Sequence, residues 1–197
     1  MTVDAPRRGF NVWDLLRLIP VCPKSWGLHI WQAPLLAAVR PGQWVQRCCG
    51  LRTNWKRQRW VVRNATIGDV FLALSKCEHL TEQRTHREVQ FMSADFHVHD
   101  CTATSFCAFF FTTYRQWLDV IEVSQVPSAA GAGRNAPLEL SAYSFSASVV
   151  PASSPLALIT AILFFWIPFS DIGQNELHLR TLHALLEENG IQVELHD

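Results

Sequence analysis

The sequence lacks the short motifs that mark the common enzyme classes. It contains no G-x-S-x-G nucleophile turn, no glycine-rich phosphate-binding loop and no H-E-x-x-H zinc motif. Serine, histidine and aspartate are present, but any protein of this size contains them. The sequence therefore identifies no reaction.

Signals for secretion and for a disulfide framework are also missing. No short apolar segment follows a basic start, as it does in a secretory signal, and no two cysteines form a C-x-x-C pair. We therefore expect an intracellular protein with reduced thiols. The six cysteines are Cys22, Cys48, Cys49, Cys77, Cys101 and Cys107.

Charged residues are scarce, at 17% of the chain, and they are divided unevenly. Residues 1–65 contain eleven Lys or Arg and two Asp or Glu, whereas residues 66–197 contain six and fifteen, so the two segments carry net charges of +9 and −9. Six of the eight tryptophans lie in the first segment. We divide the chain into a basic, Trp-rich extension (1–65) and a domain (66–197). The asymmetry indicates a partner surface or a targeting role for the extension, unless the two segments simply pack on each other.

Within the extension, four residues are spaced like one face of a helix. Trp44, Cys48, Leu51 and Trp55 recur at intervals of four, three and four residues, with basic residues between them. Such a helix would attract anionic lipid while its tryptophans enter the membrane interface. The alternatives are packing on the acidic domain, organelle targeting and, least favoured, nucleic-acid binding. The residues expected to contact a membrane or partner are Trp44, Arg47, Trp55, Lys56, Arg57, Arg59 and Trp60.

The longest apolar run extends from Leu156 to Phe169 and is interrupted only by Thr160 and Pro168. It is shorter than the roughly 20 residues that a membrane-spanning helix requires. Extending the run back to residue 149 brings in two prolines, which break a helix. Three interpretations stay open: a buried element of the core, a segment in the membrane interface, or a membrane span.

The domain reads as a helix, several strands and a second helix. Apolar stripes predict helices over 66–80 and 175–189, the first with Thr66 and Asp69 in a capping box. Strands are expected in five segments: 88–101, 106–114, 117–123, 138–150 and 191–195. Consecutive strands without intervening helices imply an antiparallel sheet. We therefore predict an α+β fold, with four or five antiparallel strands covered by two main helices.

Three segments in this order, FFFTTYRQWLDVIEV, LELSAYSFSAS and SDIGQNELHLRTLHALLE, resemble the domain-of-unknown-function family numbered 1499. The resemblance covers roughly residues 66–188 and leaves the extension outside. This chain departs from the family in the apolar insertion 149–169 and in Glu176, Leu177 and His178, where basic residues are usual. The resemblance implies a topology, but the family has no established activity to carry over.

The best candidate site is the polar segment after the apolar run. Gly173 permits a positive φ, and the flanking aspartate and asparagine can bond the local backbone. One interpretation is a turn that caps the last helix. The other is a polar site in which distant residues converge. Its residues are Asp119, Glu122, Asp171, Gly173 and Asn175.

Histidines and a cysteine alternate on one predicted strand, at positions 97, 99 and 101. His and Cys are zinc ligands, but zinc takes four of them. Same-face neighbours on a strand are about 7 Å apart, so three in line rarely reach one ion. We therefore expect no metal site and no cofactor.

Taken together, these features favour a non-enzymatic interaction or scaffold protein that associates peripherally with a membrane or a larger complex. The alternative is a small-ligand-binding, hydrolase-like enzyme that uses the carboxylates of Asp119, Glu122 and Asp171. The two hypotheses differ in geometry, because only the second requires these carboxylates to line one enclosed pocket.

Overall fold

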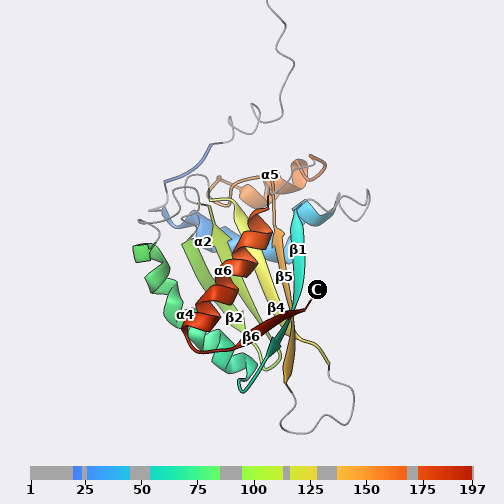
Figure 1. The fold of residues 1–197 in the computed structure, drawn as a ribbon. Coiled ribbons are helices and arrows are strands. Elements are labelled where there is room, and N and C mark those ends of the chain that lie inside the picture. The colour runs from blue at the N-terminus through green and yellow to red at the C-terminus, as the bar shows by residue number, and fades with distance from the viewer. Residues whose placement is uncertain are drawn as a thin grey trace, which may run out of the picture.

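The computed structural model describes seven parts of the chain, residues 20–23, 26–44, 54–84, 95–112, 116–127, 137–167 and 173–196. They form a six-stranded antiparallel sheet with helices on both faces (Figure 1). The strands are β1 (Trp55–Val62), β2 (Asp95–Cys101), β3 (Ser105–Phe111), β4 (Leu118–Gln125), β5 (Leu138–Ser146) and β6 (Val193–His196). The helices that pack on the sheet are α2 (Leu28–Val39), α4 (Ile67–Arg84), α5 (Ala157–Leu163) and α6 (Gln174–Glu188).

The strand order is β2-β3-β4-β5-β1-β6, and every neighbouring pair is antiparallel. Four strands, β2 to β5, follow one another along the chain and across the sheet, as consecutive strands often do. The first strand, β1, lies between β5 and β6. The predicted α+β class with an antiparallel sheet is therefore confirmed.

The sheet has one strand more than the upper limit we predicted, and the extra strand is β1. The spacing of Trp44 to Trp55 predicted a helix there, but from Trp55 onward the chain is extended. Trp60 lies opposite Leu140 of β5 on one side and Leu195 of β6 on the other. β1 is hydrogen-bonded to a strand on each side, and these distant partners favour an extended chain over the helix that local spacing predicted. Residues that the sequence placed in the extension thus lie inside the sheet.

Helices α4 and α6 cover one face of the sheet (Figure 1). Leu74 of α4 and Leu182 of α6 are fully buried there against Trp60, Phe110 and other sheet residues. The predicted capping box at the start of α4 is confirmed, because the Thr66 N–H donates to Asp69 Oδ2 (2.8 Å) and the Asp69 N–H donates to Thr66 Oγ1 (3.3 Å).

The opposite face of the sheet packs against α2 and α5. Leu36 of α2 and Ala157 of α5 are buried there against Phe109, Phe145 and their neighbours. The apolar run therefore contributes one side of a short helix to the core. Among the described residues, no helix is both long and apolar enough to cross a membrane.

Candidate functional site

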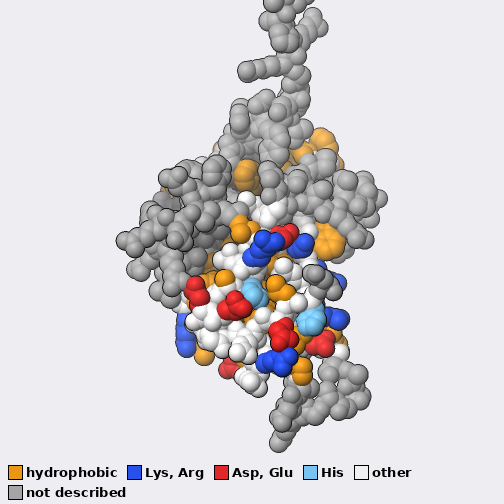
Figure 2. All heavy atoms as spheres, viewed as in Figure 1, with side chains coloured by type: hydrophobic (Ala, Val, Ile, Leu, Met, Phe, Trp, Pro, Cys, Tyr) orange, Lys and Arg blue, Asp and Glu red, His pale blue; other side chains and the backbone are white. Residues whose placement is uncertain are grey.

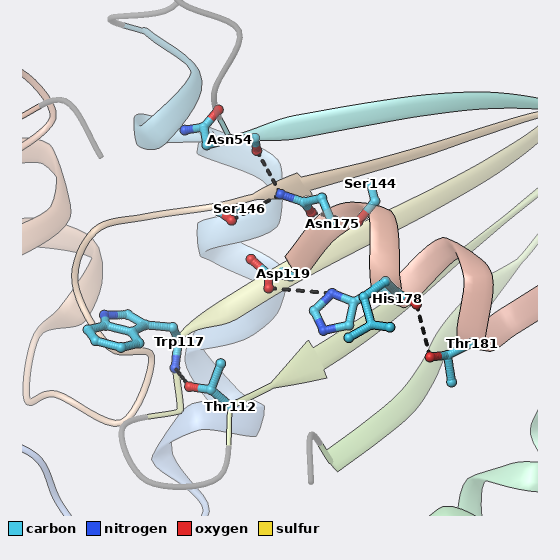
Figure 3. A network of polar contacts seen from close by, with 10 residues as sticks. Asn54, Thr112, Trp117, Asp119, Ser144, Ser146, Asn175, His178 and Thr181 are labelled. Atoms are coloured by element: carbon cyan, nitrogen blue, oxygen red, sulfur yellow. Dashed lines mark hydrogen bonds and ion pairs between the residues drawn. The ribbon is translucent and has the colours of Figure 1, made fainter. Parts of the chain in front are cut away.

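A buried polar cluster lies where the first turn of α6 meets the ends of β4 and β5 (Figure 3). Its centre is Asn175, which is fully buried. Asn175 Oδ1 accepts a hydrogen bond from Ser144 Oγ (2.6 Å), and Nδ2 donates to the Asn54 carbonyl (2.9 Å) and to Ser146 Oγ (3.3 Å). The cluster thus joins α6 to β5 and to the residue that precedes β1.

Gly173 places Asn175 on the sheet side of α6. As predicted, Gly173 has a positive φ (82°), and it occupies the N-cap position itself. Asn175 therefore lies inside the first turn of the helix, so it is Gly173 and not Asn175 that caps the helix. Its side-chain amide forms hydrogen bonds with the sheet, because Ser144 and Ser146 are two residues apart on β5 and therefore both face it.

Asp119 and His178 extend the cluster along the same interface. His178 Nδ1 lies 3.5 Å from Asp119 Oδ2, without the geometry of a hydrogen bond, and both side chains are buried. The imidazole also stacks on Phe110, with ring centroids 4.4 Å apart. Burial lowers the pKa of His178 to about 3. At neutral pH this ring is therefore uncharged, which suits a packing role.

Glu122 does not belong to this cluster, although the sequence placed it beside Asp119. The two residues are three positions apart on β4, so their side chains lie on opposite faces of the sheet. Glu122 is half-buried on the α2 face, where it pairs with Arg40. The Arg40 guanidinium in turn lies over the Phe145 ring, 4.9 Å from its centroid. Asp171 lies outside the described residues.

Sequence reasoning identified Asp119, Gly173 and Asn175 but missed His178, Ser144 and Asn54. The first two carried a usable signal. His178 follows Asn175 by three residues, which places both on one face of a helix, and Ser144 precedes Ser146 by two, which places both on one face of a strand. Asn54 carried none, because its backbone carbonyl, rather than its side chain, accepts the bond from Asn175.

The alternating residues of β2 do not assemble a metal site in the part of the chain that the structure describes, where no group of three His, Cys, Asp or Glu side chains is close enough to share an ion. An irregularity in the pairing of β2 with β3 falls between Val98 and Asp100. His99 stacks on the Phe109 ring, with centroids 4.6 Å apart.

The residues expected to contact a membrane or partner separate into different environments. Trp60 is fully buried in the core beneath α4 and α6, so its predicted surface role is wrong. Lys56 faces α6 and pairs with Glu176 (3.3 Å). Arg57 and Arg59 alternate with Lys56 and lie on the α2 and α5 face. Arg47 lies outside the described residues.

Two tryptophans of the same set lie against the face that carries α2 and α5. Trp44 packs edge-on against Phe165, with centroids 5.3 Å apart, and its indole donates to the Val39 carbonyl (3.0 Å). Trp55 packs on Tyr143 (5.6 Å). The basic, Trp-rich extension and the apolar run therefore meet at Trp44 and Phe165.

A second candidate site is the outer surface of α2, α5 and the residues that flank these helices, which we call the apolar layer. No Asp, Glu, Lys or Arg occurs in residues 27–39 or 149–167. Trp31 is 80% exposed and Leu163 is 66% exposed, although both are large and apolar. The apolar layer comprises Trp26, Ile30, Trp31, Leu35, Leu156, Ile159, Ile162, Leu163, Phe165 and Trp166.

Gln32 holds the two helices of the apolar layer together. Its Nε2 donates to the carbonyls of Ala152 (3.1 Å) and Ser154 (2.8 Å), and its Oε1 accepts from the Ala157 N–H (2.7 Å). This polar side chain of α2 thus points inward and forms hydrogen bonds with backbone groups of the segment that leads into α5. Apart from Thr160, whose hydroxyl donates to the Leu156 carbonyl, the large side chains left on the outside of the two helices are apolar.

Comparison with protein families, with curated proteins and with solved structures finds no match. The resemblance to the family numbered 1499 stays a prediction.

Proposed function

We propose that this protein is a non-enzymatic scaffold that attaches peripherally to membranes through the apolar layer. The observation that carries the proposal is the pair of uncharged helices, α2 and α5, which expose large apolar side chains on their outer surfaces while Leu36, Ala157 and other small or apolar side chains pack inward. A helix that is apolar on all sides is normally buried. The sheet buries only one side of each, so the other side calls for a second apolar environment.

The dimensions and composition of the apolar layer suit a membrane interface. The helices have 12 and 7 residues, well below the roughly 20 that a span requires, so they would lie along the surface. Trp26, Trp31 and Trp166 are exposed among the aliphatic side chains. Tryptophan is favoured at the headgroup level, where its ring is apolar and its N–H stays hydrated.

The enzyme alternative loses support from the arrangement of the carboxylates. Asp119 is buried beneath α6, whereas Glu122 is paired with Arg40 on the other face of the sheet. A reaction that needs both groups at one substrate is disfavoured by a sheet that lies between them. The buried Asn175 cluster is better explained as a connection between α6 and the sheet.

The proposal can be tested by flotation of the full-length protein with lipid vesicles. We expect the wild-type chain to float and the double variant Trp31→Gln, Leu163→Gln to lose at least tenfold in partitioning. Full burial of one large apolar side chain contributes about 1.5–3 kcal/mol, and a tenfold change corresponds to about 1.4 kcal/mol.

A matched control is Leu72→Gln on α4. Leu72 is also apolar and 53% exposed, but it lies on the helix that covers the opposite face of the sheet. We expect this variant to float like the wild type. A wild-type protein that stays in solution beside vesicles at low salt would refute the proposal. A stable dimer that hides the apolar layer would refute it as well, because a second copy would then be the occupant.

A further inference from the structure

Two arginines of β1 stand beside the apolar layer on the same face of the sheet. The Arg57 guanidinium lies over the Tyr143 ring, 5.5 Å from its centroid. The Tyr143 hydroxyl donates to Gln43 Oε1 (3.1 Å), and the neighbouring Trp44 packs on Phe165 of the apolar layer. Contacts thus run without a break from Arg57 to the apolar layer. Arg59 lies two residues further along the same face.

These two arginines differ from other basic residues near them in having no acidic partner among the described side chains. Arg40 pairs with Glu122, Lys56 with Glu176 and Arg63 with Glu194. Glu139 is on the same face as Arg59, but it does not lie opposite either arginine. Its partner across the strands is Val61. The Arg57 guanidinium and the exposed Arg59 side chain on the same face are therefore available to bind an external anion beside the apolar layer.

We infer that the protein selects anionic bilayers, and that Arg57 and Arg59 bind the phosphate and carboxylate groups of lipid headgroups while the apolar layer enters the interface. This inference rests on the proposed function. Apolar insertion alone does not distinguish anionic from neutral lipid, whereas basic residues beside the inserted surface do. The planar guanidinium also suits such headgroups, because it donates two parallel hydrogen bonds to a phosphate or carboxylate.

The test compares vesicles of phosphatidylcholine with vesicles that also contain phosphatidylserine. We expect wild-type protein to bind the anionic vesicles more tightly, with an advantage that shrinks as salt is raised. In the double variant Arg57→Gln, Arg59→Gln, we expect binding to anionic vesicles to fall by roughly 10- to 30-fold. Binding of this variant to phosphatidylcholine should equal that of the wild type.

Lys56→Gln is the matched control, since it removes one positive charge from the same strand on the opposite face. We expect it to keep the preference for anionic lipid. Equal wild-type binding to both vesicle types would overturn this inference and leave the proposed function intact, whereas absence of binding to either would overturn the proposed function itself. A loss with Lys56→Gln as large as with the arginine pair would also overturn the inference, because net charge alone would then explain it. Thermal unfolding of each variant verifies that the fold is kept.

Discussion

At the scale of single residues, Asn175 makes the most hydrogen bonds in the buried cluster, and these bonds cross from a helix to a sheet. Buried polar groups stabilise a fold only while their partners are present, because a donor or acceptor left alone in the interior has already lost its water. Ser144 Oγ is fully buried and bonds to Asn175. The Asn175 amide therefore stabilises the α6–β5 interface in addition to its apolar packing.

Replacement of Asn175 by alanine should destabilise the protein by about 1–3 kcal/mol, since it removes the acceptor of the buried Ser144 hydroxyl. Urea unfolding followed by circular dichroism measures the change. The control is Gln174→Ala, which shortens the preceding, half-exposed side chain of the same helical turn and should change the free energy of unfolding by less than about 0.5 kcal/mol. Equal effects of the two variants would show that the cluster adds no stability.

His178 makes stability depend on pH, and the direction follows from its pKa. In the unfolded chain the ring binds a proton below its ordinary pKa of 6.5, whereas in the folded protein burial keeps it neutral down to about 3. The unfolded state thus binds more protons between these values. His178 therefore makes folding less favourable as pH falls through that range, by up to about 1.4 kcal/mol per pH unit.

The variant His178→Gln should lose this part of the pH dependence. The measurement is the free energy of unfolding from pH 7 to pH 4 for both proteins. We expect a shallower decline in the variant, whatever its stability at pH 7. Parallel curves for the two proteins would contradict the buried, neutral state of His178.

At the scale of elements, the chain after α2 is held against the end of β5 by a close backbone contact. The Gly42 N–H donates to the Ala147 carbonyl (2.9 Å). A Cβ atom at position 42 would lie 2.9 Å from that oxygen and 3.0 Å from the Ser146 carbonyl. Both neighbours are backbone atoms, so they cannot move aside as a flexible side chain would.

Gly42→Ala should therefore destabilise the protein by about 1–3 kcal/mol, the usual cost of overpacking. Gly68→Ala is the matched control, because its Cβ would find Thr66 Oγ1 as its nearest neighbour at 3.6 Å, an ordinary contact. Residue 68 lies in α4, where alanine is favoured over glycine by up to about 1 kcal/mol. The two substitutions should thus change the midpoint of thermal unfolding in opposite directions. A shift of the same sign in both would show that the approach at Gly42 is not tight.

The elements that the sequence predicted well are those whose signals are local. Helix α4 begins at its capping box, and α6 carries its stripe of Leu179, Leu182 and Leu186, all fully buried. Strand β1 was missed because its neighbours in the sheet, β5 and β6, lie far away in the sequence. Glu122 was placed beside Asp119 although the two residues are three positions apart. On a strand, an odd spacing puts two side chains on opposite faces of the sheet.

At the scale of the whole molecule, the two helical layers differ in chemistry. Figure 2, which faces α4 and α6, shows basic and acidic side chains mixed over that side. The other side carries the apolar layer, with no charged residue in either helix. This difference between a charged side and an apolar side is what the proposed peripheral attachment would require.

The division of charge along the sequence is partly neutralised within the fold. Among the described residues, three ion pairs join a basic residue of the first 65 positions to an acidic residue of the remainder: Arg40–Glu122, Lys56–Glu176 and Arg63–Glu194. The two segments thus pack on each other, as one interpretation of the sequence held. Arg57 and Arg59 are not part of these pairs. Their positive charges therefore stay without a neutralising acidic side chain in these pairs, on the face that carries the apolar layer.

The sequence by itself determined the α+β class, the two amphipathic helices, the positive φ of Gly173 and the existence of an uncharged apolar run. These depend on periodicity and on local backbone preferences, which neighbouring residues set. The tertiary structure decided which side chains stay exposed, on which face of the sheet each carboxylate lies and, among the described residues, which arginines have no acidic partner. Those outcomes depend on strand pairing and on the packing of distant segments. One sequence pattern, such as the apolar run, fits both a core and a surface until its neighbours in space are known.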